Sequence, residues 1–165
     1  MTRTLLSLLL ATVLAACAGA RSVVPDRSTL SMVHEKLGSP TDIWFDQNGD
    51  EIWEYAGGPK GTETYVVRAD DRGLVKAVSQ VLTEAQFAKV IPGKMTKADV
   101  RHLLGRPSDQ VFLHNGTSWT WRVNLRPETG YFVVHFDGKD MVLDKAIVVD
   151  ASDGDGGKGD RGSSK

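Results

Sequence analysis

The sequence lacks several features that would support large classes of function. It contains a single cysteine in 165 residues, so no disulfide can form within the chain and the core must hold the fold. Its 20 lysines and arginines are balanced by 21 aspartates and glutamates, and this lack of a basic excess argues against nucleic-acid binding. The main apolar run, Leu5 to Leu14, covers about 10 residues, whereas a membrane-spanning helix needs roughly 20.

Motifs for catalysis and for metal or cofactor binding are also missing. No nucleophile elbow, phosphate-binding loop or dinucleotide fingerprint occurs, and no nucleophile, base and acid group together. Asp46-x-Asn48-x-Asp50 imitates a calcium loop, but Glu51 replaces the required glycine, so a hairpin turn explains it better. The histidines, which show no metal-ligand spacing, are His34, His102, His114 and His135. We therefore expect no enzyme, no cofactor and no metal site.

The start of the chain is typical of an export signal. Arg3 precedes the apolar run, and Leu14-Ala15-Ala16-Cys17 follows it in a pattern that resembles the bacterial lipobox. We predict that residues 1–16 are a cleaved signal peptide and that Cys17 carries a diacylglyceryl group and an N-acyl chain. The alternative is an ordinary secretory signal with an incidental thiol. By resemblance to bacterial lipoproteins, Ala18 implies an anchor in the outer membrane, facing the periplasm.

The chain repeats itself after 67 positions. Val33 to Pro40 matches Val100 to Pro107, with Gly38 opposite Gly105 (105 − 38 = 67). The same shift carries Thr29 to Thr96. After a one-residue deletion, the match continues from Trp53-Glu54-Tyr55 to Trp119-Thr120-Trp121 and from Tyr65-Val66-Val67 to Tyr131-Phe132-Val133. Landmarks in one order at one spacing predict two tandem units.

Each unit has the pattern of a helix followed by an antiparallel sheet. Thr29 and Thr96 are candidate N-caps, and Gly38 and Gly105 end the two helices. Thr83 to Val90 predicts an extra short helix, with Gln86 completing a capping box. Strands are expected around turns at Asn48-Gly49, Asp71-Arg72-Gly73, Asn115-Gly116 and Asp137-Gly138. Helices on one face of an antiparallel sheet make an α+β fold.

These patterns divide the chain into five segments. Cys17 and a short linker occupy residues 17–26, the first unit residues 27–82, and the second unit residues 83–150, after the signal at 1–16. Residues 151–165 contain no large apolar side chain, so we expect a disordered tail.

The second unit resembles the SmpA/OmlA (BamE-like) family of outer-membrane lipoproteins. The family shows a Gly-x-Thr-x-x-x-Val-x-x-x-Leu-Gly-x-Pro run, which Thr96, Val100, Leu104-Gly105 and Pro107 match, with Gly93 one residue further away. Trp119-Thr120-Trp121 supplies the aromatic strand that follows. The resemblance covers residues 83–149 well and residues 25–82 more loosely. The β-lactamase-inhibitor protein has a similar architecture of tandem helix–sheet units.

The resemblance implies a non-catalytic assembly or scaffold factor of the outer membrane, acting in β-barrel protein assembly or envelope integrity. Its partners would be envelope proteins such as β-barrel assembly subunits. The family has one unit where this chain has two, so a periplasmic protein-binding or inhibitory module is the alternative. Most recurrent aromatics are expected in the core, whereas Trp44 and Phe45, beside the first hairpin, are candidate partner contacts.

Overall fold

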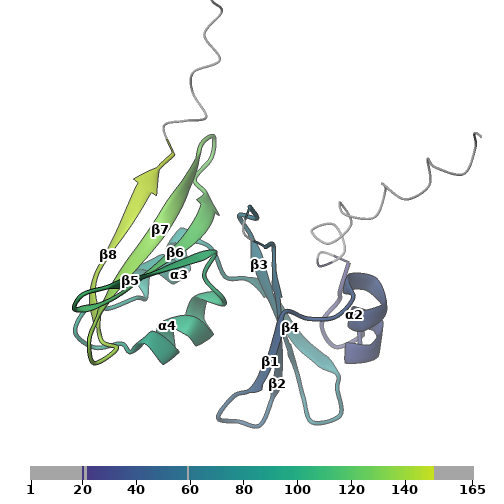
Figure 1. Ribbon diagram of the computed structural model, residues 1–165. Coiled ribbons are helices and arrows are strands. Elements are labelled where there is room, and N and C mark those ends of the chain that lie inside the picture. The colour runs from purple at the N-terminus through teal and green to yellow at the C-terminus, as the bar shows by residue number, and fades with distance from the viewer. Residues whose placement is uncertain (1–19, 21, 59, 151–165) are drawn as a thin grey trace, which may run out of the picture.

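The computed structural model describes residues 20, 22–58 and 60–150 (Figure 1). The predicted signal peptide, Cys17 and the tail 151–165 lie outside the described residues. The described chain forms two four-stranded antiparallel sheets and a few short helices, so the predicted α+β class is confirmed. Within this part of the chain, no helix is long and apolar enough to cross a membrane.

The first half consists of helix α2 (Leu30–Leu37) and a sheet in the order β1-β2-β3-β4. Thr29 caps α2 by accepting a hydrogen bond from Met32 N at 3.4 Å, and Gly38 ends it at a φ of 78°. The strands are β1 (Asp42–Phe45), β2 (Glu51–Ala56), β3 (Thr64–Ala69) and β4 (Val75–Gln80). The core between α2 and the sheet comprises Val23, Leu30, Val33, Val67, Ala69 and Val75.

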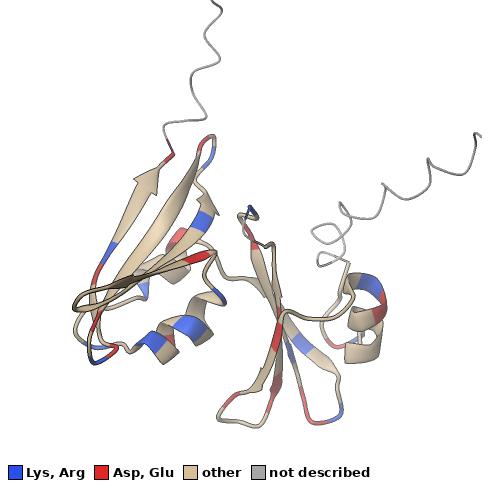
Figure 2. Cartoon of the chain, in the orientation of Figure 1, with Lys and Arg blue, Asp and Glu red and all other residues tan. Residues whose placement is uncertain are grey.

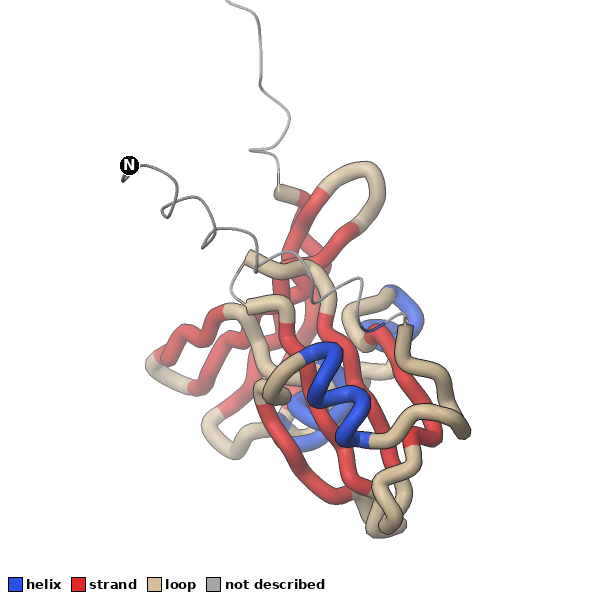
Figure 3. The backbone as a smooth tube through the Cα atoms, turned by 90° about the vertical axis from the view of Figure 1, so that its right-hand side faces the viewer, coloured by secondary structure: helices blue, strands red, loops and turns tan. Residues whose placement is uncertain are grey.

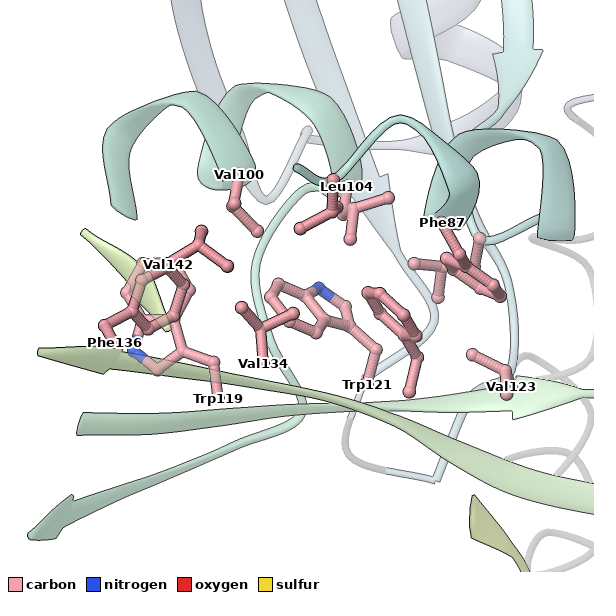
Figure 4. Packing of buried hydrophobic residues seen from close by; sticks show 12 residues of the cluster. Phe87, Val100, Leu104, Trp119, Trp121, Val123, Val134, Phe136 and Val142 are labelled. Carbon is pink, nitrogen blue, oxygen red and sulfur yellow. The ribbon is translucent and has the colours of Figure 1, made fainter. Parts of the chain in front are cut away.

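The second half adds a helix before the same arrangement. Helices α3 (Glu84–Ala88) and α4 (Lys97–Leu104) precede a sheet in the order β5-β6-β7-β8. Its strands are β5 (Asp109–Leu113), β6 (Gly116–Asn124), β7 (Thr129–Asp137) and β8 (Val142–Val149). Trp119, Trp121 and Phe136 reach from these strands towards Val100 and Leu104 of α4 (Figure 4). This aromatic core is larger than that of the first half.

The caps predicted at Thr29 and Thr96 are both confirmed, and the one predicted at Thr83 is confirmed in part. At α4 the capping box is complete: Thr96 accepts from Asp99 N, and Asp99 accepts from Thr96 N at 2.8 Å. The cap of α3 is confirmed, because Thr83 accepts from Gln86 N. The predicted reciprocal bond from Gln86 is wrong. Its Oε1 is buried and has no hydrogen-bond partner among the described residues.

The two halves share element bounds at the predicted spacing. Helix α2 spans residues 30–37 and α4 spans residues 97–104, each bound shifted by 67. The isolated bridge Thr29–Leu74 recurs as Thr96–Met141 at the same shift. The matching of Tyr65 with Tyr131 is wrong by one residue, because strand register places Tyr65 opposite Gln80 and Phe132 opposite Ile147. The offset in residue number between equivalent positions of β3 and β7 is therefore again 67.

The turn before each last strand is held by one aspartate. Leu74 N donates to Asp70 Oδ1 at 2.9 Å, and Met141 N donates to Asp137 Oδ1 at the same distance. The hydrogen bond from Leu74 N is the main reason that the pKa of Asp70 falls to about 2. The hydrogen bond from Met141 N likewise lowers the pKa of Asp137. Ionised aspartates therefore stabilise equivalent turns in the two halves.

Two further expectations need correction. The segment 17–26 is not wholly a linker, because Val23 is buried in the first core and Asp26 N donates to Val75 O at 2.8 Å. The turn between β5 and β6 was expected at Asn115-Gly116 but lies at residues 114–115, because Leu113 pairs with Gly116, which begins β6. A Cβ on Gly116 would lie 1.9 Å from Phe136 O, so close packing requires this glycine.

The elements stack in four layers: α2, the first sheet, α4 and the second sheet (Figure 1). Figure 3 views this stack from the α2 side, with the first sheet directly behind that helix. Helix α4 therefore lies between the sheets. One of its faces packs into the second core, and the other meets the face of the first sheet that α2 leaves uncovered.

Candidate partner-binding site at the junction of the sheets

A buried carboxylate joins the two halves of the chain. Glu54 on β2 is 0% exposed, and its Oε2 accepts a hydrogen bond from Arg101 Nη1 of α4 at 2.6 Å. Its Oε1 accepts from the backbone N–H of Arg106 at 2.7 Å, just beyond the end of α4. Both oxygens are thus satisfied by groups that lie 47 and 52 residues further along the chain. We call Glu54, Arg101 and Arg106 N the clasp.

Strand and helix periodicity bring these groups together. Side chains alternate along β2, so Trp53 and Tyr55 point to α2 and Glu54 points the other way, towards α4. On α4, Val100 and Leu104 enter the second core, which leaves Arg101 on the face towards the first sheet. Figure 2 shows basic positions on α4 and acidic positions on the first sheet beside it.

An aromatic contact extends the clasp. Trp44 on β1 stacks on His102 of α4, with ring centroids 5.6 Å apart and planes inclined by 13°. The guanidinium carbon of Arg101 lies 5.6 Å from the Trp44 ring centroid, and Arg101 Nη2 pairs with Asp42 at 2.5 Å. Arg101 thus contacts two carboxylates and an indole at once, which fixes the position of α4 on the first sheet.

The chemistry of the clasp is structural. A buried carboxylate without a cation is strongly unfavourable, and removing one partner of a buried ion pair costs roughly 3–5 kcal/mol. Glu54 has both a cation and a backbone N–H, so its charge is compensated in place. The clasp therefore holds the surfaces of the two sheets in a defined relation.

A cleft of about 550 Å³ opens beside the clasp, with walls from both halves. The loop after β2 contributes Gly57, Gly58 and Gly61, and the segment entering β5 contributes Arg106 to Gln110. Leu82, Phe112 and Trp121 add apolar surface to the lining. The size and the mixed lining suit a short peptide segment or a small ligand.

A smaller hollow of about 280 Å³ lies near the first hairpin. Trp44, Phe45, Ile52 and His102 line it together with Arg68. Arg68 is tied to the hairpin by ion pairs to Asp46 at 2.8 Å and to Asp50 at 3.6 Å. The Asp46-x-Asn48-x-Asp50 segment is thus a hairpin turn held by an arginine, as its sequence indicates.

Two exposed phenylalanines occupy equivalent places at the ends of edge strands. Phe45 ends β1 and is 68% exposed, whereas Phe112 lies one residue before the end of β5 and is 82% exposed. Their spacing is 67 residues (112 − 45), the spacing of the repeat. Phe45 shares its strand with exposed Ile43, and Phe112 stands between exposed Val111 and Leu113, so both mark candidate binding surface.

Of the residues predicted from sequence, the structure describes Trp44 and Phe45, which are neighbours in β1. Cys17 lies outside the described residues. Trp44 is half-buried against α4, so it serves the junction between the halves, while Phe45 is open to solvent. Partner contact by either residue stays a prediction. Sequence reasoning missed Phe112, which the shift from Phe45 would have found, and Glu54, which stands between two aromatics in a strand.

The histidines occupy separate places. His102 stacks on Trp44, and His34 forms a T-shaped contact with Trp53, with ring centroids 6.3 Å apart. His135 Nδ1 lies 2.6 Å from Asp144 Oδ1. In the part of the chain that the structure describes, no three histidine, cysteine, aspartate or glutamate side chains are grouped so that they could hold a metal ion.

Comparison with known proteins gives one family match. No curated protein matches the sequence. Among solved structures, a DUF4309 family protein (YjgB) from Bacillus subtilis aligns over 84% of this chain and 95% of its own, with 11% identity and a TM-score of 0.31. Residues 79–146, which are 68 (146 − 78) of the 165, match the model of the outer membrane protein assembly factor BamE domain. The second half of this chain is therefore BamE-like.

Proposed function

We propose that this protein is a lipid-anchored component of the bacterial outer membrane that faces the periplasm. It acts without catalysis, as an assembly or scaffold factor for β-barrel outer-membrane proteins or for envelope integrity. The observation that carries the proposal is the match of residues 79–146 to the BamE domain. The lipobox-like Leu14-Ala15-Ala16-Cys17 supports the same compartment.

We further propose that the first half is a second BamE-like unit. Its support is the same order of a helix and four antiparallel strands, with α2 and α4 offset by 67 residues at both ends. The equivalent turns held by Asp70 and Asp137 support the same relation. Two such units held by the clasp form a scaffold with two fixed sheets.

The proposed anchor places this scaffold close to the membrane. Val23 is the first residue in the first core, six positions after Cys17 (23 − 17). Six residues reach at most about 20 Å when fully extended. Several acyl chains on one cysteine make release from the bilayer negligible, because each buried CH₂ contributes roughly 0.8 kcal/mol.

The decisive experiment deletes the gene in the source organism and complements it with variants. We expect deletion to lower the amounts of β-barrel proteins in the outer membrane and to increase sensitivity to large antibiotics. The full chain restores both, and Cys17→Ser at equal expression does not. An unaltered outer membrane, together with no β-barrel assembly subunit among proteins crosslinked in intact cells, contradicts the assembly role.

Lipidation is measured separately. Mass spectrometry of the mature chain is expected to show a polypeptide that begins at Cys17 and carries fatty acyl groups. Metabolic labelling with an alkyne fatty acid is expected to mark the natural chain and not Cys17→Ser. A free thiol or another start site contradicts the anchor, whatever the deletion strain shows.

A protein-binding or inhibitory module is the second candidate. The cleft of about 550 Å³ between the halves supports it, because its walls combine glycine backbone, apolar surface and charges. This function predicts that the crosslinked partners are secreted enzymes or envelope components outside the assembly machinery. Crosslinks to β-barrel assembly subunits alone argue against it.

A further inference from the structure

Strand β5 is an open edge of the second sheet. The sheet order β5-β6-β7-β8 gives β5 a single neighbour, so within the described chain the backbone groups on its other side have no strand to pair with. All of its residues, Asp109–Leu113, are exposed. An edge of this kind offers main-chain hydrogen bonds to any extended polypeptide that approaches it.

The other edge strands differ from β5. Strand β8 contains Lys145, whose Nζ donates to the carbonyl oxygens of Phe87 and Ala88, and strand β4 contains Lys76, which pairs with Asp70. Each of these two strands also has a register shift against its neighbour, and such shifts twist an edge away. Strand β1 has only four residues, and its Trp44 is covered by His102 of α4.

Strand β5 has none of these features. Its sequence, Asp-Gln-Val-Phe-Leu, contains no lysine or proline. Its pairing with β6 runs without a shift from Asp109–Thr120 to Leu113–Gly116. Edges that stay open and apolar in soluble domains are sites of strand addition or of aggregation. The difference from the other three edges therefore marks β5 as a binding edge.

Apolar side chains stand on both faces of this edge. Val111 (48% exposed) and Leu113 (46%) lie on one face, and Phe112 (82%) lies on the other, because neighbours in a strand alternate. A strand added beside β5 would cover all three with its own side chains. The added segment must therefore carry apolar residues, because polar side chains would lose hydration against this apolar surface without gaining hydrogen bonds.

The cleft continues this edge at its start. Asp109, Gln110 and Phe112 line the cleft together with Trp121 and Gly61. A polypeptide running along β5 would thus pass directly into a cavity of about 550 Å³ that can take a side chain or a chain end. Strand edge and cleft form one continuous surface.

We propose that β5 and the cleft bind an extended, apolar segment of a partner polypeptide as a fifth strand of the second sheet. Main-chain hydrogen bonds to β5 supply affinity, and Phe112 with its neighbours selects apolar side chains. This binding mode does not depend on the assembly role, because it rests on the backbone and side chains of β5.

The test uses the mature chain with Cys17→Ser, so that no lipid is attached. The probe is a short peptide of alternating valine and threonine with a lysine at each end. Its control has the same side chains but alternate backbone nitrogens methylated, so that it cannot donate to an edge. We expect the probe to slow amide hydrogen exchange in β5 by at least about tenfold, and the methylated peptide to have no effect.

Two matched variants locate the site. Phe112→Lys places a charge on the β5 edge and is expected to weaken probe binding at least about tenfold. Phe45→Lys makes the same change at the equivalent position of the first half and is expected to leave binding unchanged. Both side chains are exposed, so both variants are expected to keep the stability of the natural chain.

Three outcomes overturn the proposal. Equal binding of both peptides means that the backbone edge is not used. If hydrogen exchange in β5 is not slowed at the highest concentration at which the probe dissolves, the edge does not accept a strand. A dimer of the chain in sedimentation experiments that Phe112→Lys dissolves means that the occupant is a second copy.

Discussion

Gly105 lies directly against the buried carboxylate of Glu54. A Cβ built on Gly105 would be 3.1 Å from Glu54 Cδ and 2.9 Å from Thr64 Cγ2, both on the first sheet. The residue also has a φ of 76° and a ψ of −170°, a combination open almost only to glycine. One glycine thus ends helix α4 and allows it to approach the other half of the chain.

Gly105→Ala is expected to destabilise the protein more than Gly38→Ala. Gly38 has nearly the same backbone angles, but a Cβ added to it would meet nothing within 4 Å, so only the strain of about 1–3 kcal/mol applies there. Gly105→Ala adds a clash with Glu54 and Thr64. Urea unfolding of both variants measures the difference, and equal losses would show that the close approach is unimportant.

Glu54→Gln tests the clasp. The amide keeps the shape but removes the buried charge that pairs with Arg101, so we expect a loss of about 3–5 kcal/mol in the free energy of unfolding. Glu51→Gln on the same strand, half-buried and bonded to Trp53 Nε1, is the control and should cost less. A double-mutant cycle with Arg101→Met is expected to show coupling. Additive losses would contradict a direct ion pair.

Trp44→Ala separates structure from binding at the first hairpin. It removes the stack on His102 and the contact with Arg101, so we expect a loss of about 2–4 kcal/mol. Phe45→Ala removes an exposed ring and is expected to change stability by less than about 0.5 kcal/mol. Thermal unfolding of the two variants checks this contrast. A large loss from Phe45→Ala would mean that its ring is packed in solution.

Acid is expected to weaken the turns held by Asp70 and Asp137. Their folded pKa values lie below the ordinary 3.8, that of Asp70 at about 2, so their contribution is present above about pH 4. The contribution of Asp70 is lost as pH falls from about 4 to about 2, and that of Asp137 is lost below about pH 4, because protonation removes the charged hydrogen-bond acceptor. Stability of the natural chain therefore falls in this window.

The charge is tested with Asp70→Asn and Asp137→Asn, which keep an oxygen acceptor. Both variants are expected to be less stable at neutral pH and to lose less stability between about pH 4 and about 2. Asp71→Asn, an exposed neighbour, is the control. Urea midpoints across this pH range measure the effect, and an unchanged slope in both turn variants would contradict it.

Local signals in the sequence were sufficient for the helices and strands. Thr96 with Asp99, and Gly38 with Gly105, specify helix starts and ends through hydrogen bonds within a few residues. The alternation from Trp119 to Val123 likewise records one buried face. These predictions succeeded because each depends on neighbours in the chain. The error at Tyr65 arose because similar aromatics one residue apart cannot fix a register without the partner strand.

The candidate site depends on contacts that no local pattern records. Glu54 meets Arg101 across 47 residues, and its role requires the outward face of a sheet to be covered by a helix from the other half. The stack of Trp44 on His102 likewise joins two distant parts of the chain, and the sequence around Trp44 does not record it. Phe112 was passed over because a strand sequence alone does not reveal which strand lies at the edge of its sheet.

Because α4 lies between the sheets, the first half depends on contacts from the second half more than the second depends on the first. Every residue of the second core lies at Leu82 or later, so no side chain of the first sheet belongs to it. The first half, cut after residue 82, would leave the carboxylate of Glu54 without a cation and Trp44 without its cover. The N-terminal half therefore has its buried charge and its outer indole covered only when α4 lies against it.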